Sequence, residues 1–312
     1  MQIGMIGLGR MGGNMARRLA LGGADVVAFD RSAEARESLA QVKGVATVAS
    51  LAEFVQRLKA PRIVWLMLPA GAVTEETLSS VASLLASGDL VVDGGNAHYR
   101  DAQRRAKTLA QSGVQFADAG VSGGVWGLEY GYGLMVGGAP AAIERLAPFL
   151  RVLAPGAQRG WLHCGPVGAG HFVKMVHNGI EYGMMQSYAE GFALLQARSD
   201  LELDVAKIAE SWRYGTVIRS WLLDLTAGFL AQDSKLDSLE PFVADSGEGR
   251  WTAVEAIELG VPTPVMSLAL MMRFASQGRA DYASRLLARM RQGFGGHATK
   301  AAAAAPATKP AA

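Results

Sequence analysis

The sequence has 312 residues, of which 50% are hydrophobic and 19% charged, so it is long enough for two domains and can bury a sizeable core. Its formal net charge of +2 at pH 7 is too small to indicate a nucleic-acid or membrane-surface binder. The single cysteine, Cys164, cannot form an internal disulfide and is typical of a reducing compartment. No metal is expected, because Cys164, His163 and His171 have no second thiol or carboxylate at ligand spacing.

The sequence carries no signal for export or membrane insertion. It enters strand-like sequence directly, without a basic region followed by an apolar stretch. The longest apolar runs, such as residues 63–68, are far too short to span a bilayer. We therefore expect a cytoplasmic protein that binds neither nucleic acid nor membrane.

The first half of the chain alternates predicted strands and helices. Short apolar runs predict strands at residues 2–6, 25–29, 63–68 and 90–92. Helical patterns lie between them, at residues 13–21 and 102–111. This alternation predicts a doubly wound sheet, and hence an α/β Rossmann-type N-terminal domain over residues 1–165.

The pattern changes at about Gly168. Long helical patterns follow, with almost no strand signal, at residues 171–198, 203–231, 251–259 and 264–292. They predict an all-α C-terminal domain over residues 166–298. Residues 299–312 are rich in alanine and proline, and we expect them to be disordered.

A glycine-rich turn joins the first predicted strand to the first helix. Residues 7–12 have the G-x-G-x-x-G pattern that cradles a dinucleotide. Gly7 permits a tight turn, Gly9 lets a pyrophosphate approach the backbone, and Gly12 lets helix and strand pack closely. The pattern alone is weak evidence, but here it lies between a strand and a helix, and Asp30 ends the next strand.

The residues that follow the second strand indicate which cofactor is bound. The Asp30 carboxylate would accept hydrogen bonds from ribose hydroxyls and repel a 2′-phosphate, whereas the neighbouring Arg31 could attract that phosphate. We therefore expect NAD, with NADP left open. The expected cofactor-binding residues are Gly7, Leu8, Gly9, Arg10, Met11, Gly12, Asp30, Arg31, Leu68 and Asn96.

One helix carries an unusual polar stripe. Five polar residues at positions i, i+3, i+4, i+7 and i+8 share one face of the helix: Lys174, His177, Asn178, Glu181 and Tyr182. They supply an amine, an imidazole, an amide, a carboxyl and a phenol. The other side carries apolar residues expected to pack, namely Met175, Val176, Ile180, Met184 and Met185. Lys174 and Glu181 are two turns apart, roughly 10 Å along the axis, so both could contact a six-carbon ligand.

Two further turns carry groups suited to the same ligand. The sequence D-G-G-N at residues 93–96 follows a predicted strand, where ligands bind in open α/β sheets. The sequence V-S-G-G at residues 121–124 offers a hydroxyl and open backbone amides for a carboxylate.

These segments together resemble 6-phosphogluconate dehydrogenase in its shorter form. GLGRMGGNMARRL, DGGN, VSGG and KMVHNGIEY carry the resemblance, which covers nearly the whole chain up to His297. K-x-x-H-N-x-x-E-Y combined with D-G-G-N is much more specific than the nucleotide motif. The related 3-hydroxyisobutyrate dehydrogenases share the N-terminal pattern and the lysine, but are not expected to carry H-N-x-x-E-Y.

The resemblance implies a reaction and a role for each residue. Lys174 would take the proton from the C3 hydroxyl of 6-phosphogluconate while hydride leaves C3, and would then polarise the ketone so that C1 leaves as carbon dioxide. Glu181 would protonate C1 of the enediol. The resemblance assigns substrate binding to Asn96, Ser122, Gly123, Gly124, His177 and Asn178, with Tyr182 at the phosphate.

The phosphate is expected to have further donors. Arg273 lies in an apolar stretch where an idle arginine would be poorly placed, and Arg291 and His297 reproduce the R-x5-H spacing that closes the longer relatives. In that family the terminal segment reaches into the neighbouring subunit, so we expect a homodimer or homotetramer with shared sites.

The sequence also departs from the longer relatives. Where they have K-G-T-G-K-W, this chain has S-G-E-G-R-W, so Ser246 supplies no positive charge and Arg250 is the candidate substitute. Asp30-Arg31-Ser32 replaces their N-R-T, consistent with NAD, and a second helical repeat is missing. Two alternatives stay open: a dehydrogenase of an unphosphorylated 3-hydroxy acid, and a catalytically silent nucleotide-binding regulator in which Lys174 and Glu181 have no task.

Overall fold

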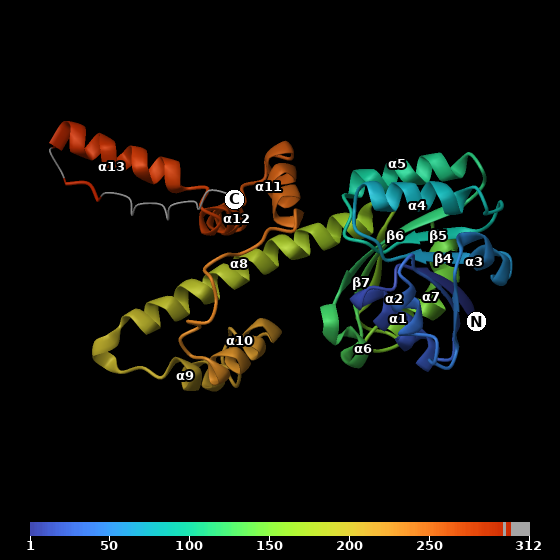
Figure 1. The fold of residues 1–312 in the computed structure, drawn as a ribbon, viewed down its shortest axis with the longest axis horizontal. Helices are drawn as coiled ribbons and strands as arrows, with labels where there is room; N and C mark the ends of the chain where they lie inside the picture. Colours follow the sequence, from blue (N-terminus) through green and yellow to red (C-terminus); the bar gives the residue numbers. More distant parts are fainter. Residues whose placement is uncertain (296–297, 301–312) are drawn as a thin grey trace, which may run out of the picture. The chain divides into compact units, whose positions relative to one another are not determined.

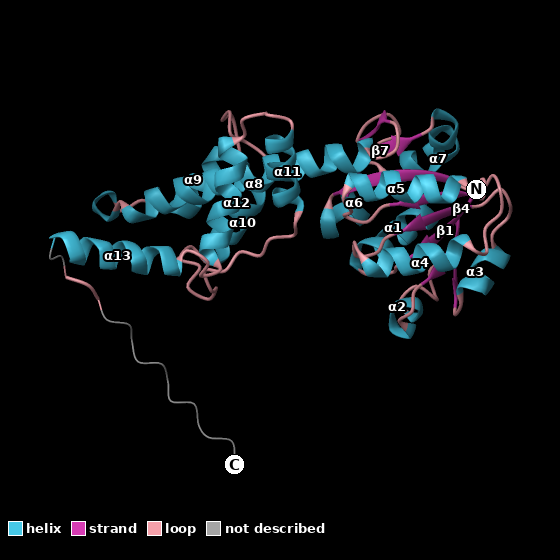
Figure 2. Ribbon diagram, turned by 90° about the horizontal axis from the view of Figure 1, so that it is seen from above, coloured by secondary structure: helices cyan, strands magenta, loops and turns pink. Residues whose placement is uncertain are grey.

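The computed structural model describes residues 1–295 and 298–300. The chain forms two compact units, an N-terminal unit of residues 1–180 and a C-terminal unit of residues 181–312. Their boundary falls within one long helix, α8 (Ala169–Ala197). Figure 2 shows that the strands belong to the N-terminal unit, whereas the C-terminal unit is built from helices. The predicted Rossmann-type domain followed by an all-α domain is therefore confirmed, while the predicted boundary at residue 165 stays a prediction.

The N-terminal unit is built on one eight-stranded sheet with the order β3-β2-β1-β4-β5-β6-β7-β8. All neighbours are parallel except β6 and β7, which are antiparallel. The chain order reverses between β1 and β4, where ligands bind at the carboxyl ends of the strands. The strands are β1 (Gln2–Ile6), β2 (Asp25–Phe29), β3 (Val45–Val48), β4 (Ile63–Leu66), β5 (Leu90–Asp93), β6 (Gln115–Ser122), β7 (Gly133–Gly138) and β8 (Trp161–Gly165).

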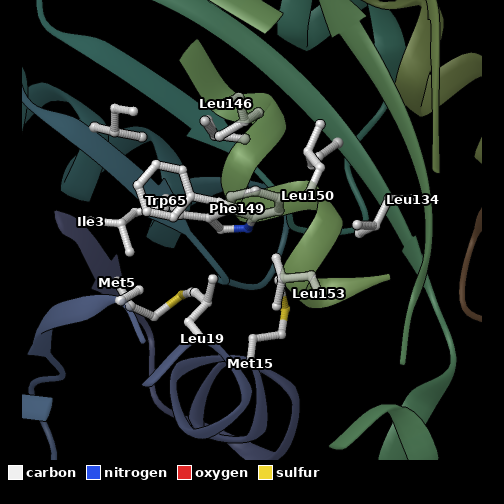
Figure 3. Close-up of a cluster of buried hydrophobic side chains, with 14 of the residues drawn as sticks. Ile3, Met5, Met15, Leu19, Trp65, Leu134, Leu146, Phe149, Leu150 and Leu153 are labelled. Atoms are coloured by element: carbon white, nitrogen blue, oxygen red, sulfur yellow. The ribbon is translucent and has the colours of Figure 1, made fainter. Parts of the chain in front are cut away.

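Helices cover both faces of this sheet (Figure 1). One core contains side chains of α1 and α7, and Figure 3 shows Met15 and Leu19 of α1 packed near Phe149 of α7 and Trp65 of β4. The other core contains side chains of α3, α4 and α5. The helices of this unit are α1 (Arg10–Leu21), α2 (Ala33–Glu37), α3 (Leu51–Arg57), α4 (Ala72–Ala82), α5 (Tyr99–Ala110), α6 (Gly127–Tyr130) and α7 (Pro140–Leu153), with a 3-10 turn, η1 (Gly124–Trp126).

The C-terminal unit contains the rest of α8 and the helices that follow it. They are α9 (Val205–Trp212), α10 (Trp221–Gln232), α11 (Glu248–Glu258), α12 (Pro264–Ser276) and α13 (Asp281–Gly295), with a 3-10 turn, η2 (Ser199–Leu201). No helix in the described ranges is long and apolar enough to cross a membrane.

Two predicted helices were wrong in length. The single helix predicted at residues 203–231 is two helices, α9 and α10, and the one predicted at residues 264–292 is α12 and α13. A glycine with positive φ lies just after the first helix of each pair, Gly215 at +74° and Gly278 at +75°. A left-handed glycine ends a helix, because it turns the chain away from the helical path at no steric cost.

Candidate active site

The turn between β1 and α1 has the geometry of a dinucleotide cradle. A Cβ at Gly12 would lie 1.9 Å from the Gly7 carbonyl oxygen, so only glycine permits this close approach of helix and strand. A Cβ at Gly9 would meet no described atom within 4 Å, so the backbone there is open. Gly9 is also the N-cap of α1 and has no side chain to cap the N–H groups of the first turn. These N–H groups and the open backbone fit the pyrophosphate of NAD.

Asp30, at the end of β2, holds this turn in place. Its Oδ2 accepts a hydrogen bond from the Leu8 N–H at 2.7 Å, and its Oδ1 accepts one from the Ser32 N–H at 2.8 Å. Each carboxylate oxygen keeps a lone pair for a ribose hydroxyl. Arg31 is exposed next to it. Asp30 therefore both shapes the turn and lies where the sequence predicted it.

Leu68 follows β4 and Asn96 follows β5, the two strands that come after β1 in the sheet order. A Cβ at Gly7 would lie 2.9 Å from Leu68 Cδ2, so Leu68 packs against the glycine-rich turn. A Cβ at Gly95 would lie 2.4 Å from the Leu68 carbonyl oxygen, so the turn that carries Asn96 lies directly on the end of β4. Asn96 itself is exposed. Leu68 thus contacts both the nucleotide turn and the turn that carries Asn96.

A buried ion pair, which the sequence did not reveal, lies next to the turn that carries Asn96. Asp93 Oδ2 lies 2.5 Å from Arg105 Nη1, and both side chains are only 1% exposed. Asp93 Oδ1 accepts a hydrogen bond from the Gly95 N–H at 3.1 Å. Arg105 also donates to Glu75 of α4 at 2.8 Å. Partial burial raises the pKa of Glu75, but hydrogen bonds from Arg105 and Arg104 outweigh it and hold this pKa below its usual value.

The V-S-G-G turn follows the strand against which Lys174 packs. Gly123 and Gly124 have φ values of +128° and +53°, and Gly124 is exposed. Two residues before Ser122 on β6, Gly120 lies against the helix, because a Cβ there would be 2.3 Å from Lys174 Cβ. Lys174 is 6% exposed. The structure therefore places Lys174 beside the strand that ends in the predicted carboxylate-binding turn.

In the polar stripe of α8, Lys174, Asn178 and Tyr182 are buried, whereas His177 and Glu181 are half-buried. Asn178 is buried, and its Oδ1 lies 3.0 Å from His177 Nδ1. The prediction that the opposite face packs was wrong for three residues, because Ile180 is 52% exposed and Met184 and Met185 are each 39% exposed. The physical reason is that the buried side of the helix carries stripe residues, as where Lys174 packs against Gly120 of β6.

In the C-terminal unit, Tyr182 and Arg273, two of the residues predicted to bind phosphate, contact each other, and their role at a phosphate stays a prediction. The Arg273 guanidinium lies 3.4 Å from the centroid of the Tyr182 ring, and its Nη1 donates to the Ala244 carbonyl at 2.9 Å. The Tyr182 hydroxyl lies 3.2 Å from Ser246 Oγ and donates to Asp245 Oδ1 at 3.3 Å.

The other predicted phosphate donors are placed less directly. Arg250 pairs through its Nε with Asp245 Oδ2, so its charge is already balanced by a carboxylate. Burial raises the pKa of Asp245, but hydrogen bonds from the Gly247 N–H and from Arg250 outweigh this effect and hold the pKa below its usual value. Arg291 is exposed on α13, and His297 lies outside the described residues, so their roles stay predictions.

The histidine and cysteine considered as metal ligands have other surroundings. His163 Nε2 lies 2.9 Å from both the Gly138 and Gly165 carbonyl oxygens. Burial raises the pKa of the Cys164 thiol, which disfavours the thiolate that binds metals. Among residues 1–295 and 298–300, no group of three or more His, Cys, Asp or Glu side chains could hold a metal ion.

The sheet order, the glycine-rich turn, Asp30 and a buried lysine on the following helix define a Rossmann-type dehydrogenase with a helical second unit. Comparison with family models makes this specific. Residues 2–165 match the NAD binding domain of 6-phosphogluconate dehydrogenase, and residues 170–305 match the 6-phosphogluconate dehydrogenase C-terminal domain. The chain belongs to the 6-phosphogluconate dehydrogenase family.

Individual relatives agree with this assignment. The NAD(+)-dependent, decarboxylating 6-phosphogluconate dehydrogenase of Haloferax volcanii is 43% identical over 95% of this chain and 98% of its own length. A Plasmodium falciparum 6-phosphogluconate dehydrogenase, solved with NADP+ and with 6-phosphogluconate, superposes with a TM-score of 0.83 at 30% identity, covering 95% of this chain and 65% of its own. The Mycobacterium tuberculosis 3-hydroxyisobutyrate dehydrogenase shares the fold, with a TM-score of 0.71 at 24% identity over 90% of this chain and 94% of its own.

Proposed function

We propose that this protein oxidatively decarboxylates 6-phosphogluconate to ribulose 5-phosphate and carbon dioxide, with NAD as the hydride acceptor. Membership of the family and the named activity of the Haloferax volcanii relative support the proposal. The observation that carries it is Lys174, buried on Gly120 beside the Ser122–Gly124 turn, on a helix that continues with His177, Asn178 and Glu181. The test is an assay of the purified protein with 6-phosphogluconate and NAD, in which reduced cofactor and carbon dioxide are both followed.

The proposed mechanism divides the proton transfers between two side chains of α8. Lys174, as a neutral amine, accepts the proton of the C3 hydroxyl, and bound NAD supplies the acceptor for the hydride from C3. The resulting β-keto acid loses C1 as carbon dioxide because the ketone, polarised by the Lys174 ammonium, accepts the electrons. Glu181 then protonates the enediol at the former C2 of the substrate, which becomes C1 of ribulose 5-phosphate. Ser122, Gly123, Gly124, Asn96, His177 and Asn178 would hold the sugar acid.

Cofactor choice is tested at Asp30. We expect a higher kcat/KM with NAD than with NADP, and Asp30→Ala should narrow the ratio about fivefold, since repulsion between two charges near 4 Å is worth about 1 kcal/mol in water. Asp25→Ala, at the exposed start of the same strand, is the control and should leave the ratio unchanged. A wild-type protein that clearly prefers NADP would refute this assignment.

We also propose a homo-oligomer, a dimer or tetramer, in which the end of each chain completes a neighbour's phosphate site. Removal of residues 291–312 should raise the KM for 6-phosphogluconate far more than the KM for NAD, because Arg291 and His297 would be lost. Removal of residues 299–312 keeps both residues and is the control. A cytoplasmic location stays a prediction.

Mixing two defective proteins, assayed at a 6-phosphogluconate concentration where each alone has little activity, would decide whether the tail acts across the interface. Lys174→Met protein and tail-deleted protein are combined and allowed to exchange subunits. If tails act across the interface, some hybrid sites regain an intact Lys174 and a donated tail, so activity reappears. No recovery despite proven subunit exchange would mean that the tail serves its own chain or no site at all.

An unphosphorylated 3-hydroxy acid is the second candidate substrate. It is favoured by the ion pair between Arg250 and Asp245, which balances a charge that a phosphate would otherwise use. The two candidates are separated by comparing 6-phosphogluconate with gluconate and 3-hydroxyisobutyrate at equal concentrations. Turnover of 6-phosphogluconate alone would support a phosphate site around Tyr182 and Arg273.

A further inference from the structure

Helix α8 is fixed to the sheet by a buried carboxylate that belongs to neither the nucleotide turn nor the polar stripe. Asp118 lies in the middle of β6 and is 0% exposed. Its Oδ1 accepts a hydrogen bond from the Gly168 N–H at 2.6 Å, and its Oδ2 accepts one from the His171 N–H at 2.7 Å. These N–H groups at the start of the helix have no partner within the helix, so Asp118 caps it from another element.

The backbone of α8 also approaches the sheet very closely at its first turn. A Cβ at Gly170 would lie 2.6 Å from the Asp118 carbonyl oxygen and 2.5 Å from that of Met135. A Cβ at Gly137 would lie 2.8 Å from the Gly170 nitrogen. Since no side chain separates helix and sheet at these points, the helix is held in one register by the two bonds to Asp118.

The side chain of His171 does not provide a second anchor. His171 is 3% exposed, and neither ring nitrogen has a hydrogen-bond partner within the described part of the chain. At this residue it is therefore the backbone N–H, hydrogen-bonded to Asp118, that holds the helix to the sheet. Lys174 follows three residues later, roughly 4.5 Å along the axis.

We propose that Asp118 is a positioning residue for Lys174. The two oxygens of Asp118 fix the first turn of α8 through the Gly168 and His171 N–H groups. Two residues further along the same strand, Gly120 packs against Lys174 Cβ. A displacement of about 1 Å in a reacting group can cost roughly 10²-fold in rate, so a frayed or shifted first turn would reach the chemistry. This inference rests on the proposed function, because it concerns Lys174 as the base.

The chain offers a matched control in Asp89, which precedes β5. Asp89 is 1% exposed, and it accepts hydrogen bonds from two backbone N–H groups, that of Arg62 at 2.6 Å and that of Ala86 at 2.9 Å. It lies at the amino end of β5, whereas the nucleotide turn and the Asn96 turn lie at the carboxyl ends of the strands. Its replacement by asparagine therefore weakens backbone contacts of the same kind without touching α8, and it also removes the charge that pairs with Arg62 Nη1 at 3.0 Å.

The experiment compares Asp118→Asn with Asp89→Asn, both assayed well below their unfolding temperatures. Asparagine keeps the size but offers one acceptor oxygen and places an N–H₂ group against the other N–H. We expect Asp118→Asn to lower kcat for 6-phosphogluconate by roughly 10²-fold, with the KM for NAD unchanged. The deuterium isotope effect with substrate labelled at C3 should rise, because hydride transfer becomes slower. Asp89→Asn should lower the unfolding temperature and keep kcat and the isotope effect of the wild type.

Hydrogen exchange gives a readout that does not depend on turnover. The amides of Gly168 and His171 should exchange faster in Asp118→Asn than in the wild type or in Asp89→Asn. A folded Asp118→Asn with wild-type kcat, or equal losses of kcat in both variants, would overturn the proposal. If Asp118→Asn does not fold, Gly120→Ala is the second variant, because its methyl group would push Lys174 Cβ away from β6. A folded Gly120→Ala with full kcat would also overturn the proposal, because the position of Lys174 on β6 would then not matter for the rate.

Failure of the proposed function is distinguishable from failure of this inference. Wild-type protein that does not oxidise 6-phosphogluconate refutes the function before any variant is made. In that case the exchange rates of the Gly168 and His171 amides decide the role of Asp118 in fixing α8, and unchanged rates in Asp118→Asn would refute it.

Discussion

Replacement of Lys174 by methionine should lower kcat for 6-phosphogluconate by about 10²–10⁴-fold, the usual contribution of a general base. Methionine has a similar length and is apolar, so it suits a side chain that is 6% exposed and packed on Gly120. No group would then remain to accept the C3 hydroxyl proton. NAD binding, measured by direct titration, should be unchanged, because the nucleotide turn lies on other elements. Near wild-type activity in Lys174→Met would show that another group is the base.

The second residue of the pair should fail at a later step. Glu181→Gln is expected to slow turnover chiefly after oxidation, at the step that protonates the carbon that becomes C1 of ribulose 5-phosphate. A first burst of reduced cofactor should therefore persist in rapid-mixing experiments. Glu190→Gln is the control, because Glu190 lies on the same helix, is exposed and hydrogen-bonds Gln186. Loss of the burst in Glu181→Gln would place this residue in the oxidation step instead.

Arg105→Met should give the largest loss of stability, about 3–5 kcal/mol, because it leaves the Asp93 carboxylate buried without its partner. The KM for NAD should rise as well, since Asp93 also holds the Gly95 N–H in the turn that carries Asn96. The measurements are urea unfolding and titration with NAD.

Arg104→Met provides the comparison for this variant. Arg104 directly precedes Arg105 on α5 and also pairs with Glu75, but its side chain is 53% exposed, so its removal should cost at most about 1 kcal/mol. Glu75, with its lowered pKa, stabilises the fold above its unfolded pKa, and this contribution is lost as the pH falls through the folded value. Equal stabilities of Arg105→Met and Arg104→Met would refute a structural role for the buried pair.

The parts of the site that depend on local chemistry could be predicted from the sequence. The turn at residues 7–12 needs glycine for its own backbone geometry, and Asp30 follows the next strand at the spacing that Rossmann-type sites require. The polar stripe of α8 was visible because helical periodicity places Lys174, His177 and Asn178 on one face. The burial of Lys174, Asn178 and Tyr182 shows that this face is not simply a solvent face.

Contacts between distant residues could not be predicted. Asp118 meets the start of α8 across 50 and 53 residues of sequence, and nothing in the local pattern of β6 marks its partner. Asp93 and Arg105 are separated by 12 residues on a strand and a helix whose packing decides whether they meet. Strands β3, β6, β7 and β8 were not predicted, and in β7 the glycines at 133, 137 and 138 weaken the strand signal.

The most direct measurement follows reduced cofactor and carbon dioxide together when the purified protein is given 6-phosphogluconate with NAD, and in parallel with NADP. We predict that both products appear in equal amounts, faster with NAD than with NADP, and that the formation of both slows by about 10²–10⁴-fold in Lys174→Met. Reduction of the cofactor without carbon dioxide, or turnover of an unphosphorylated 3-hydroxy acid but not of 6-phosphogluconate, would contradict the proposed function.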